Sequence, residues 1–115
     1  MDLETRALTS SERALIEKLL EHDFPGRNEL RIQLDSTVAR PLASEGMISL
    51  NCSKGSPAPV KHSLAVEGYT TDSDGIPIWV MLFVHAGFLD MLEIVKSDGG
   101  PIAIPPTASA LIVPQ

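Results

Sequence analysis

The most informative segment of this chain is Gly75-Ile-Pro-Ile-Trp-Val-Met-Leu-Phe-Val-His-Ala-Gly-Phe-Leu-Asp-Met-Leu-Glu-Ile-Val-Lys-Ser-Asp-Gly99. It contains two apolar runs, Ile76–Val84 and Phe88–Lys96, which are joined by a short segment with Gly87. Each run has the length of a strand, and β-branched or aromatic residues dominate the first. A Gly-containing loop of three to five residues between such runs predicts a β-hairpin. Because both runs are apolar at successive positions, both faces of this hairpin are expected to be shielded from solvent.

The pairing of the two runs decides which side chains share a face. If Val84 pairs with Phe88, Glu93 lies on an otherwise apolar face, although a one-residue slip in the turn would change the pairing. A carboxylate in such a place costs several kcal/mol unless it is paired or solvated. We therefore expect that this face is partly open to solvent or that Glu93 meets a donor, and we favour an ion pair or a backbone hydrogen bond over a ligand-binding role. In this pairing one face carries Trp79, Met81, Phe83, Leu89, Met91, Glu93 and Val95, and the other carries Ile78, Val80, Leu82, Val84, Leu92 and Ile94.

The N-terminal third of the chain predicts helices. Thr9-Ser-Ser-Glu12 fits a capping box, and apolar residues then recur at helical spacing, which predicts a helix over 10–22. Residues 29–35 alternate like a strand but also fit a helix, and we favour a short second helix. From Val38 onward the pattern is that of strands and turns. We predict a single α+β domain over 1–115, with one or two helices within 10–35, an antiparallel meander of four or five strands over 38–104, and an extended Pro-rich tail over 101–115.

Size and composition narrow the class of protein. With 115 residues, an apolar fraction of 43% and no basic, apolar leader, the chain is expected to be one cytoplasmic domain without a secretory signal or a membrane span. Its single cysteine, Cys52, cannot form an intrachain disulfide. The net charge of −6 is concentrated between Glu67 and Asp98, where Lys96 is the one cation among six carboxylates. This charge argues against nucleic-acid binding and is compatible with a basic protein partner, although acidity for solubility alone is the favoured explanation.

Candidate catalytic and metal-binding motifs are weak. Asp72-Ser-Asp-Gly75 resembles the opening of a calcium loop, but Phe83 stands where the closing glutamate belongs, so a tight turn is favoured. The three histidines, at positions 22, 62 and 85, have no ligand at a metal-binding spacing, and Cys52 has no neighbouring base. No Gly-rich segment opens a helix that could hold a phosphate. We therefore predict no catalytic residue, no metal site and no cofactor.

The run Leu82–Ile102 resembles a signature of uncharacterised small bacterial proteins, in which a Gly-x-Leu-x-x-Leu-Glu-Ile strand precedes an Asp-Gly turn. The helical leucines, Phe24-Pro25-Gly26 and Asp72-Ser-Asp-Gly75 resemble the same family, a domain of unknown function, over nearly the whole chain. Similar strands occur in immunity proteins of bacterial toxin systems. The resemblance implies a small cytosolic binding protein and supplies no catalytic residue.

Two functions follow from these patterns. The first, which we prefer, is a non-enzymatic protein-binding module, such as an immunity protein for a basic toxin. The second is a small ligand-binding or hydrolase-like enzyme that uses Glu93, Asp90 and His85. The apolar face needs a cover, for which we favour the tail, followed by a second copy in a homodimer and then by a different partner. The residues predicted to bind a partner are Trp79, Met81, Phe83, Leu89, Met91 and Glu93.

Overall fold

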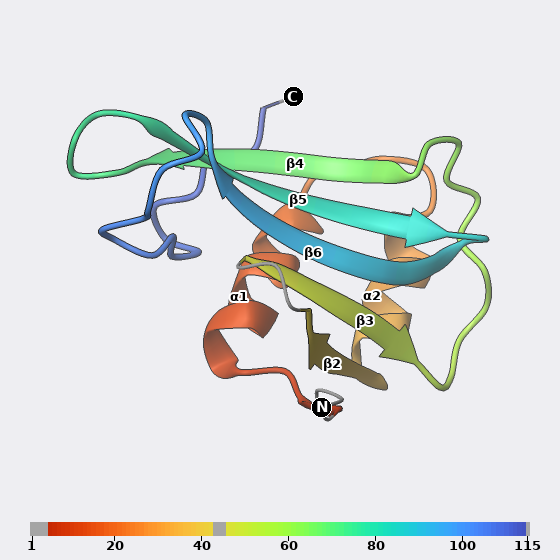
Figure 1. Cartoon of the computed structure of the whole chain (residues 1–115). Coiled ribbons are helices and arrows are strands. Elements are labelled where there is room, and N and C mark those ends of the chain that lie inside the picture. The colour runs from red at the N-terminus through yellow and green to blue at the C-terminus, as the bar shows by residue number, and fades with distance from the viewer. Residues whose placement is uncertain (1–4, 43–45, 115) are drawn as a thin grey trace.

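A computed structural model of the chain describes residues 5–42 and 46–114. Two helices pack on one face of a six-stranded antiparallel sheet whose strand order is β1-β2-β3-β6-β5-β4 (Figure 1). Neither helix is long and apolar enough to span a membrane, as far as the described residues go. The predicted α+β class is confirmed, with slightly more strands than predicted. The elements are β1 (Arg6–Ala7), α1 (Ser10–Leu19), α2 (Arg27–Leu34), β2 (Thr37–Pro41), β3 (Met47–Cys52), β4 (Leu64–Thr71), β5 (Pro77–His85) and β6 (Phe88–Lys96).

The strand order is not that of a simple meander. β3 pairs with β6 rather than with β4, and the long loop after β3 carries the chain to the far edge of the sheet, where β4 begins (Figure 1). From β4 the chain returns through β5 to β6, so the long hairpin fills the gap beside β3. This arrangement places the two most apolar strands next to each other inside the sheet, where each has a neighbour on both edges.

Local sequence signals explain both helices. At the start of α1, the Thr9 hydroxyl accepts a hydrogen bond from the Glu12 amide, and the Glu12 carboxylate accepts one from the Thr9 amide, as the capping box predicts. The helix ends at Leu19, earlier than predicted, because the amides of Glu21 and His22 bond three residues back and tighten the turn that follows. The ambiguous stretch forms α2, as favoured, after Gly26 at φ 99°. A β-carbon at Gly26 would lie 2.8 Å from Val60, so this turn needs glycine.

The hairpin turn between β5 and β6 differs from the prediction. It has two residues, Ala86 and Gly87, both at positive φ, and Val84 pairs with Leu89 rather than with Phe88. Two positive φ angles are what a type I′ turn requires, and the twist of this turn matches that of the flanking strands. Asp90 has no partner on β5, so a bulge shifts the register between Leu89 and the rest of β6. The bulge turns Leu89 toward the helices while the residues beyond it keep their predicted side of the sheet.

The hydrophobic core lies between the helices and the sheet face that they cover, which we call the inner face. Leucines from both helices pack there on alternate residues of β4, β5 and β6. The first helix, α1, therefore packs on the aliphatic side of the hairpin. The fully buried core side chains include Ile16, Leu19, Leu20, Leu30, Ile78, Val80, Leu82 and Leu92.

The C-terminal tail does not cover the opposite sheet face, and that prediction is wrong. The tail runs along the free edge of β4, where Ile112 and Tyr69 exchange two backbone hydrogen bonds of 2.8 Å. Leu111 inserts into the core between the sheet and α1, and Val113 packs beside it. A β-carbon on Gly68 would lie 2.9 Å from the Ile112 carbonyl oxygen, so the close approach of the tail uses the glycine at this edge. The tail thus seals the inner face at β4 and leaves the other face open.

Candidate functional site

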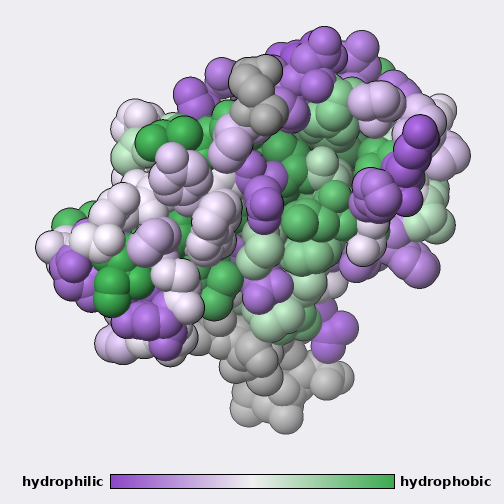
Figure 2. Space-filling view, turned by 90° about the horizontal axis from the view of Figure 1, so that it is seen from above, coloured by the Kyte–Doolittle hydropathy of each residue, from purple (hydrophilic) through white to green (hydrophobic). Residues whose placement is uncertain are grey.

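The sheet face that points away from the helices, which we call the outer face, is open over its whole width in the described structure. Pairing across the strands places the side chains at its centre in three rows. Seen from above the view of Figure 1, hydrophobic side chains gather in the middle of the surface, with hydrophilic ones among and around them (Figure 2). The rows are Leu64–Phe83–Met91–Ser49–Arg40, Glu67–Met81–Glu93–Met47 and Tyr69–Trp79–Val95.

Five of the six residues predicted to bind a partner lie on the outer face, and each is half-buried: Trp79, Met81, Phe83, Met91 and Glu93. The sixth, Leu89, is 3% exposed in the core, so its assignment to this face is wrong. The prediction assumed that the strands alternate without interruption, and the bulge at Asp90 breaks that alternation. A bulge of this kind leaves no clear mark in the sequence, because leucine fits either face.

Sequence reasoning missed several residues of the outer face because they come from other strands. Tyr69 packs against Trp79 with ring centroids 5.4 Å apart and planes tilted by 48°. Met47 of β3 lies beside Glu93, and Leu64 of β4 lies beside Phe83. Their own strands show partial alternation, but only the strand order reveals that they share a face with the hairpin.

Two carboxylates interrupt the apolar middle of the outer face. Glu67 on β4 and Glu93 on β6 both pair with Met81 on β5, so they stand on either side of its side chain in one row. With adjacent strands about 4.8 Å apart, their α-carbons are about 10 Å apart. Within residues 5–42 and 46–114, neither glutamate forms an ion pair, so the interpretation that Glu93 is neutralised by a structural partner gains no support.

The residues of the enzyme hypothesis do not converge. His85 lies at the exposed tip of the hairpin, Asp90 lies exposed in the bulge, and Glu93 pairs with Met81 farther along the strand. Met81 and His85 are four residues apart on β5, which corresponds to about 13 Å. Cys52 is no better placed as a nucleophile, because burial raises the pKa of its thiol. In the described parts of the chain, no three His, Cys, Asp or Glu side chains lie close enough together to hold a metal ion.

The Asp72–Gly75 segment forms a tight turn, as favoured, and its carboxylates serve the fold. Lys96 Nζ lies 3.0 Å from the Asp72 carboxylate and 2.6 Å from that of Asp74. Asp72 also accepts hydrogen bonds from the amides of Ala103 and Ile104, each at 2.9 Å, and thereby ties down the tail. These amides, with Lys96, hold the pKa of Asp72 far below its usual range.

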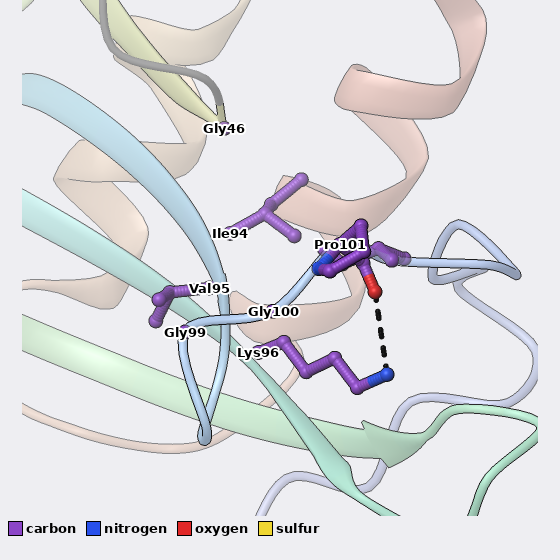
Figure 3. Close-up of a pocket in the computed structure, with 8 residues that line it drawn as sticks. Gly46, Ile94, Val95, Lys96, Gly99, Gly100 and Pro101 are labelled. Carbon is purple, nitrogen blue, oxygen red and sulfur yellow. Dashed lines mark hydrogen bonds between the residues drawn. The ribbon is translucent and has the colours of Figure 1, made fainter.

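A small cavity of about 160 Å³ lies beside Lys96 and is lined in part by Ile94, Lys96, Gly100 and Ile102. Figure 3 shows the Lys96 side chain running past the cavity to the Pro101 carbonyl, to which its amine donates a hydrogen bond of 3.3 Å. Because the amine is already occupied by two carboxylates and this carbonyl, it has little capacity left for a ligand. The cavity is therefore a weaker candidate site than the outer face.

Comparison with known proteins identifies the family of this chain. A family model described as "Domain of unknown function (DUF6984)" matches residues 5–106, and the chain belongs to that family. No curated protein and no solved structure matches the chain. The expectation of a domain of unknown function is thus confirmed.

Proposed function

We propose that this chain is a non-enzymatic protein-binding module whose outer face contacts a partner protein. The observation that carries the proposal is the composition of the open face. An antiparallel sheet with helices on one side normally presents polar residues on the other. Here all three central outward positions of β5 are apolar: Trp79, Met81 and Phe83.

The make-up of this face supports a protein interface. Aromatic residues and methionine are enriched in the buried centres of protein interfaces, where they supply contact area. The outer face brings Tyr69 and Trp79 into contact and adds three methionines, Met47, Met81 and Met91, in the two neighbouring rows. Contiguous apolar patches of more than a few hundred Å² rarely stay exposed on monomeric proteins. The tail, which could have shielded this face, lies at the β4 edge.

An immunity-type role is one form of this function that the proposal includes. A small cytoplasmic domain of this kind would mask a toxin by covering the toxin's own functional surface with the outer face. The net charge of −6 favours encounter with a basic partner, since opposite charges speed association.

The proposal is tested by photo-crosslinking in the native host. The photoreactive residue p-benzoylphenylalanine is placed at Met81, in the centre of the outer face, and in a control protein at Glu17, which is exposed on α1. We expect a discrete crosslinked product of defined mass from position 81 and none from position 17. Equal products from both positions, or none from position 81 while the protein is folded and expressed, would contradict the proposal.

A further inference from the structure

On the basis of the proposed function, we infer that the partner on the outer face is a basic protein surface whose arginine or lysine side chains pair with Glu67 and Glu93. The alternative occupant, a second copy of this chain, is disfavoured by the charges on the same face. The two glutamates flank Met81 in one cross-strand row at the middle of the apolar surface. A partner that covers Met81 must also cover or closely approach both carboxylates.

Covering a carboxylate without a cation is strongly unfavourable, because the charged group loses its hydration and gains nothing in return. Glu67 and Glu93 are already half-buried. A partner made only of apolar groups would remove their remaining water. A partner with two cations about 10 Å apart would instead turn each glutamate into a charge-assisted contact, matching the spacing of two strands.

A face-to-face homodimer cannot supply these cations. Among the described residues of the three rows, Arg40 is the one cation, and it lies on β2 beside Ser49. Each copy would therefore bring one cation and two carboxylates to the interface. At least one carboxylate per copy would be buried without a cation, whichever way a two-fold axis ran through the face.

The aromatic residues next to the glutamates suit an arginine in particular. Tyr69 and Trp79 form a contacting pair in the adjacent row, two residues along the strands from Glu67 and Met81. A guanidinium group stacks on aromatic faces and binds a carboxylate through two hydrogen bonds, whereas an ammonium group does neither as well. A partner arginine can therefore contact the aromatic pair with its plane and Glu67 with its edge. We accordingly expect a partner's arginine side chain to bind this face more tightly than a lysine side chain.

Titration of the full chain with short synthetic peptides, followed by NMR, tests the inference. The probes are a blocked peptide of alternating valine and arginine, its lysine counterpart and its glutamate counterpart. We expect the arginine peptide to shift the Met81 and Met91 methyl signals and the Trp79 indole signal, and the glutamate peptide to shift none of them. Binding should weaken at least tenfold when the salt concentration is raised from about 50 mM to about 500 mM, since salt screens exposed ion pairs.

Two double variants separate the role of the site from that of overall charge. E67Q/E93Q removes two charges from the outer face, and E17Q/E21Q removes the same number from the exposed helical side of the molecule. We expect the dissociation constant of the arginine peptide to rise at least tenfold in the first variant and to stay within twofold in the second. Equal effects of the two variants, or no effect of E67Q/E93Q, would overturn the inference. A urea unfolding curve for each variant verifies that both remain folded.

Sedimentation velocity of the unmodified chain tests the alternative occupant. We expect a monomer at micromolar concentration. A dimer that is strengthened by E67Q/E93Q would show that a second copy occupies the face, and would overturn the inference of a basic partner. The proposed function is judged separately. An equal amount of the photo-crosslinked product at position 81 when the E67Q/E93Q substitutions are also present would support the outer face as a binding surface. That result would contradict only the inference that its partner is cationic.

Discussion

Replacing Gln33 with methionine is expected to destabilise the fold by removing hydrogen bonds rather than by leaving a cavity. Gln33 is fully buried, and its side chain joins α2 to the hairpin turn and to the loop after β3. Nε2 donates to the carbonyls of Ser56 and Gly87, each at 2.9 Å, and Oε1 accepts from the Leu89 amide at 2.9 Å. Methionine has nearly the same length and volume, so packing is largely preserved.

The loss in free energy of unfolding can be estimated from the hydrogen bonds that each former partner of Gln33 retains in the variant. The Gly87 carbonyl keeps a hydrogen bond from the Ala58 amide at 2.8 Å, and Ser56 lies in an exposed loop where water can replace the lost donor. The Leu89 amide is buried and loses the acceptor supplied by Gln33. A buried amide left unpaired costs about 1–3 kcal/mol, and each of the other lost bonds costs about 0.5–1.5 kcal/mol. We therefore expect Gln33→Met to lower the free energy of unfolding by about 3 kcal/mol.

Urea unfolding at pH 7, followed by the fluorescence of the single tryptophan and by circular dichroism, measures this change. Hydrogen exchange supplies a local measurement, because the Leu89 amide should exchange faster in the variant than in the unmodified chain. Cys52→Ala is the control, since the Cys52 thiol makes only a long contact of 3.7 Å with Gln33 Oε1. A Gln33→Met protein with a free energy of unfolding within about 0.5 kcal/mol of the unmodified chain, the range of an ordinary surface substitution, would show that these hydrogen bonds do not stabilise the fold.

Three further predictions concern the core, the helix cap and the tail. Leu19→Ala truncates a fully buried side chain and should cost about 3 kcal/mol in urea unfolding; a loss below about 0.5 kcal/mol would contradict the packing of α1 on the sheet. Thr9→Ala removes the acceptor of the Glu12 amide and should cost about 1 kcal/mol, with a matching loss of helical signal on heating. Asp72→Asn should lower the urea midpoint at pH 7. Because the pKa of Asp72 is lowered by folding, its contribution is present above the unfolded-state pKa of about 4 and is lost as the pH falls below it. The difference between Asp72→Asn and the unmodified chain should therefore shrink between pH 7 and pH 3, and a difference that is constant with pH would contradict the role of the carboxylate.

The local elements of this protein could be predicted because their causes lie within a few residues. The capping box of α1 joins Thr9 and Glu12, which are three positions apart, and the helix follows from apolar residues one turn apart. The hairpin follows in the same way from two strand-length runs around Gly87. The two-residue period of one strand likewise predicts that Trp79, Met81 and Phe83 share one face of the sheet.

The outer face could be predicted only in part because it is assembled from several strands. Glu67 and Tyr69 become neighbours of the hairpin only because β4 pairs with β5, and Met47 only because β3 pairs with β6. The position of Leu89 depends on one bulge, and a shift of one residue moves a side chain to the other face.

The helices, the hairpin and the apolar character of both faces of β5 and β6 follow from the amino-acid sequence alone, since these depend on short-range spacing. Which of the two faces stays open depends on contacts made in the folded chain. The tail carries enough aliphatic residues to cover either face, but Asp72 binds the amides of Ala103 and Ile104, and Tyr69 pairs with Ile112 at the β4 edge. Those contacts join residues far apart in the chain, and they form only where the folded sheet presents a free edge and a buried carboxylate together. Spacing along a strand fixes which side chains share a face, whereas pairing between distant segments determines what that face contacts.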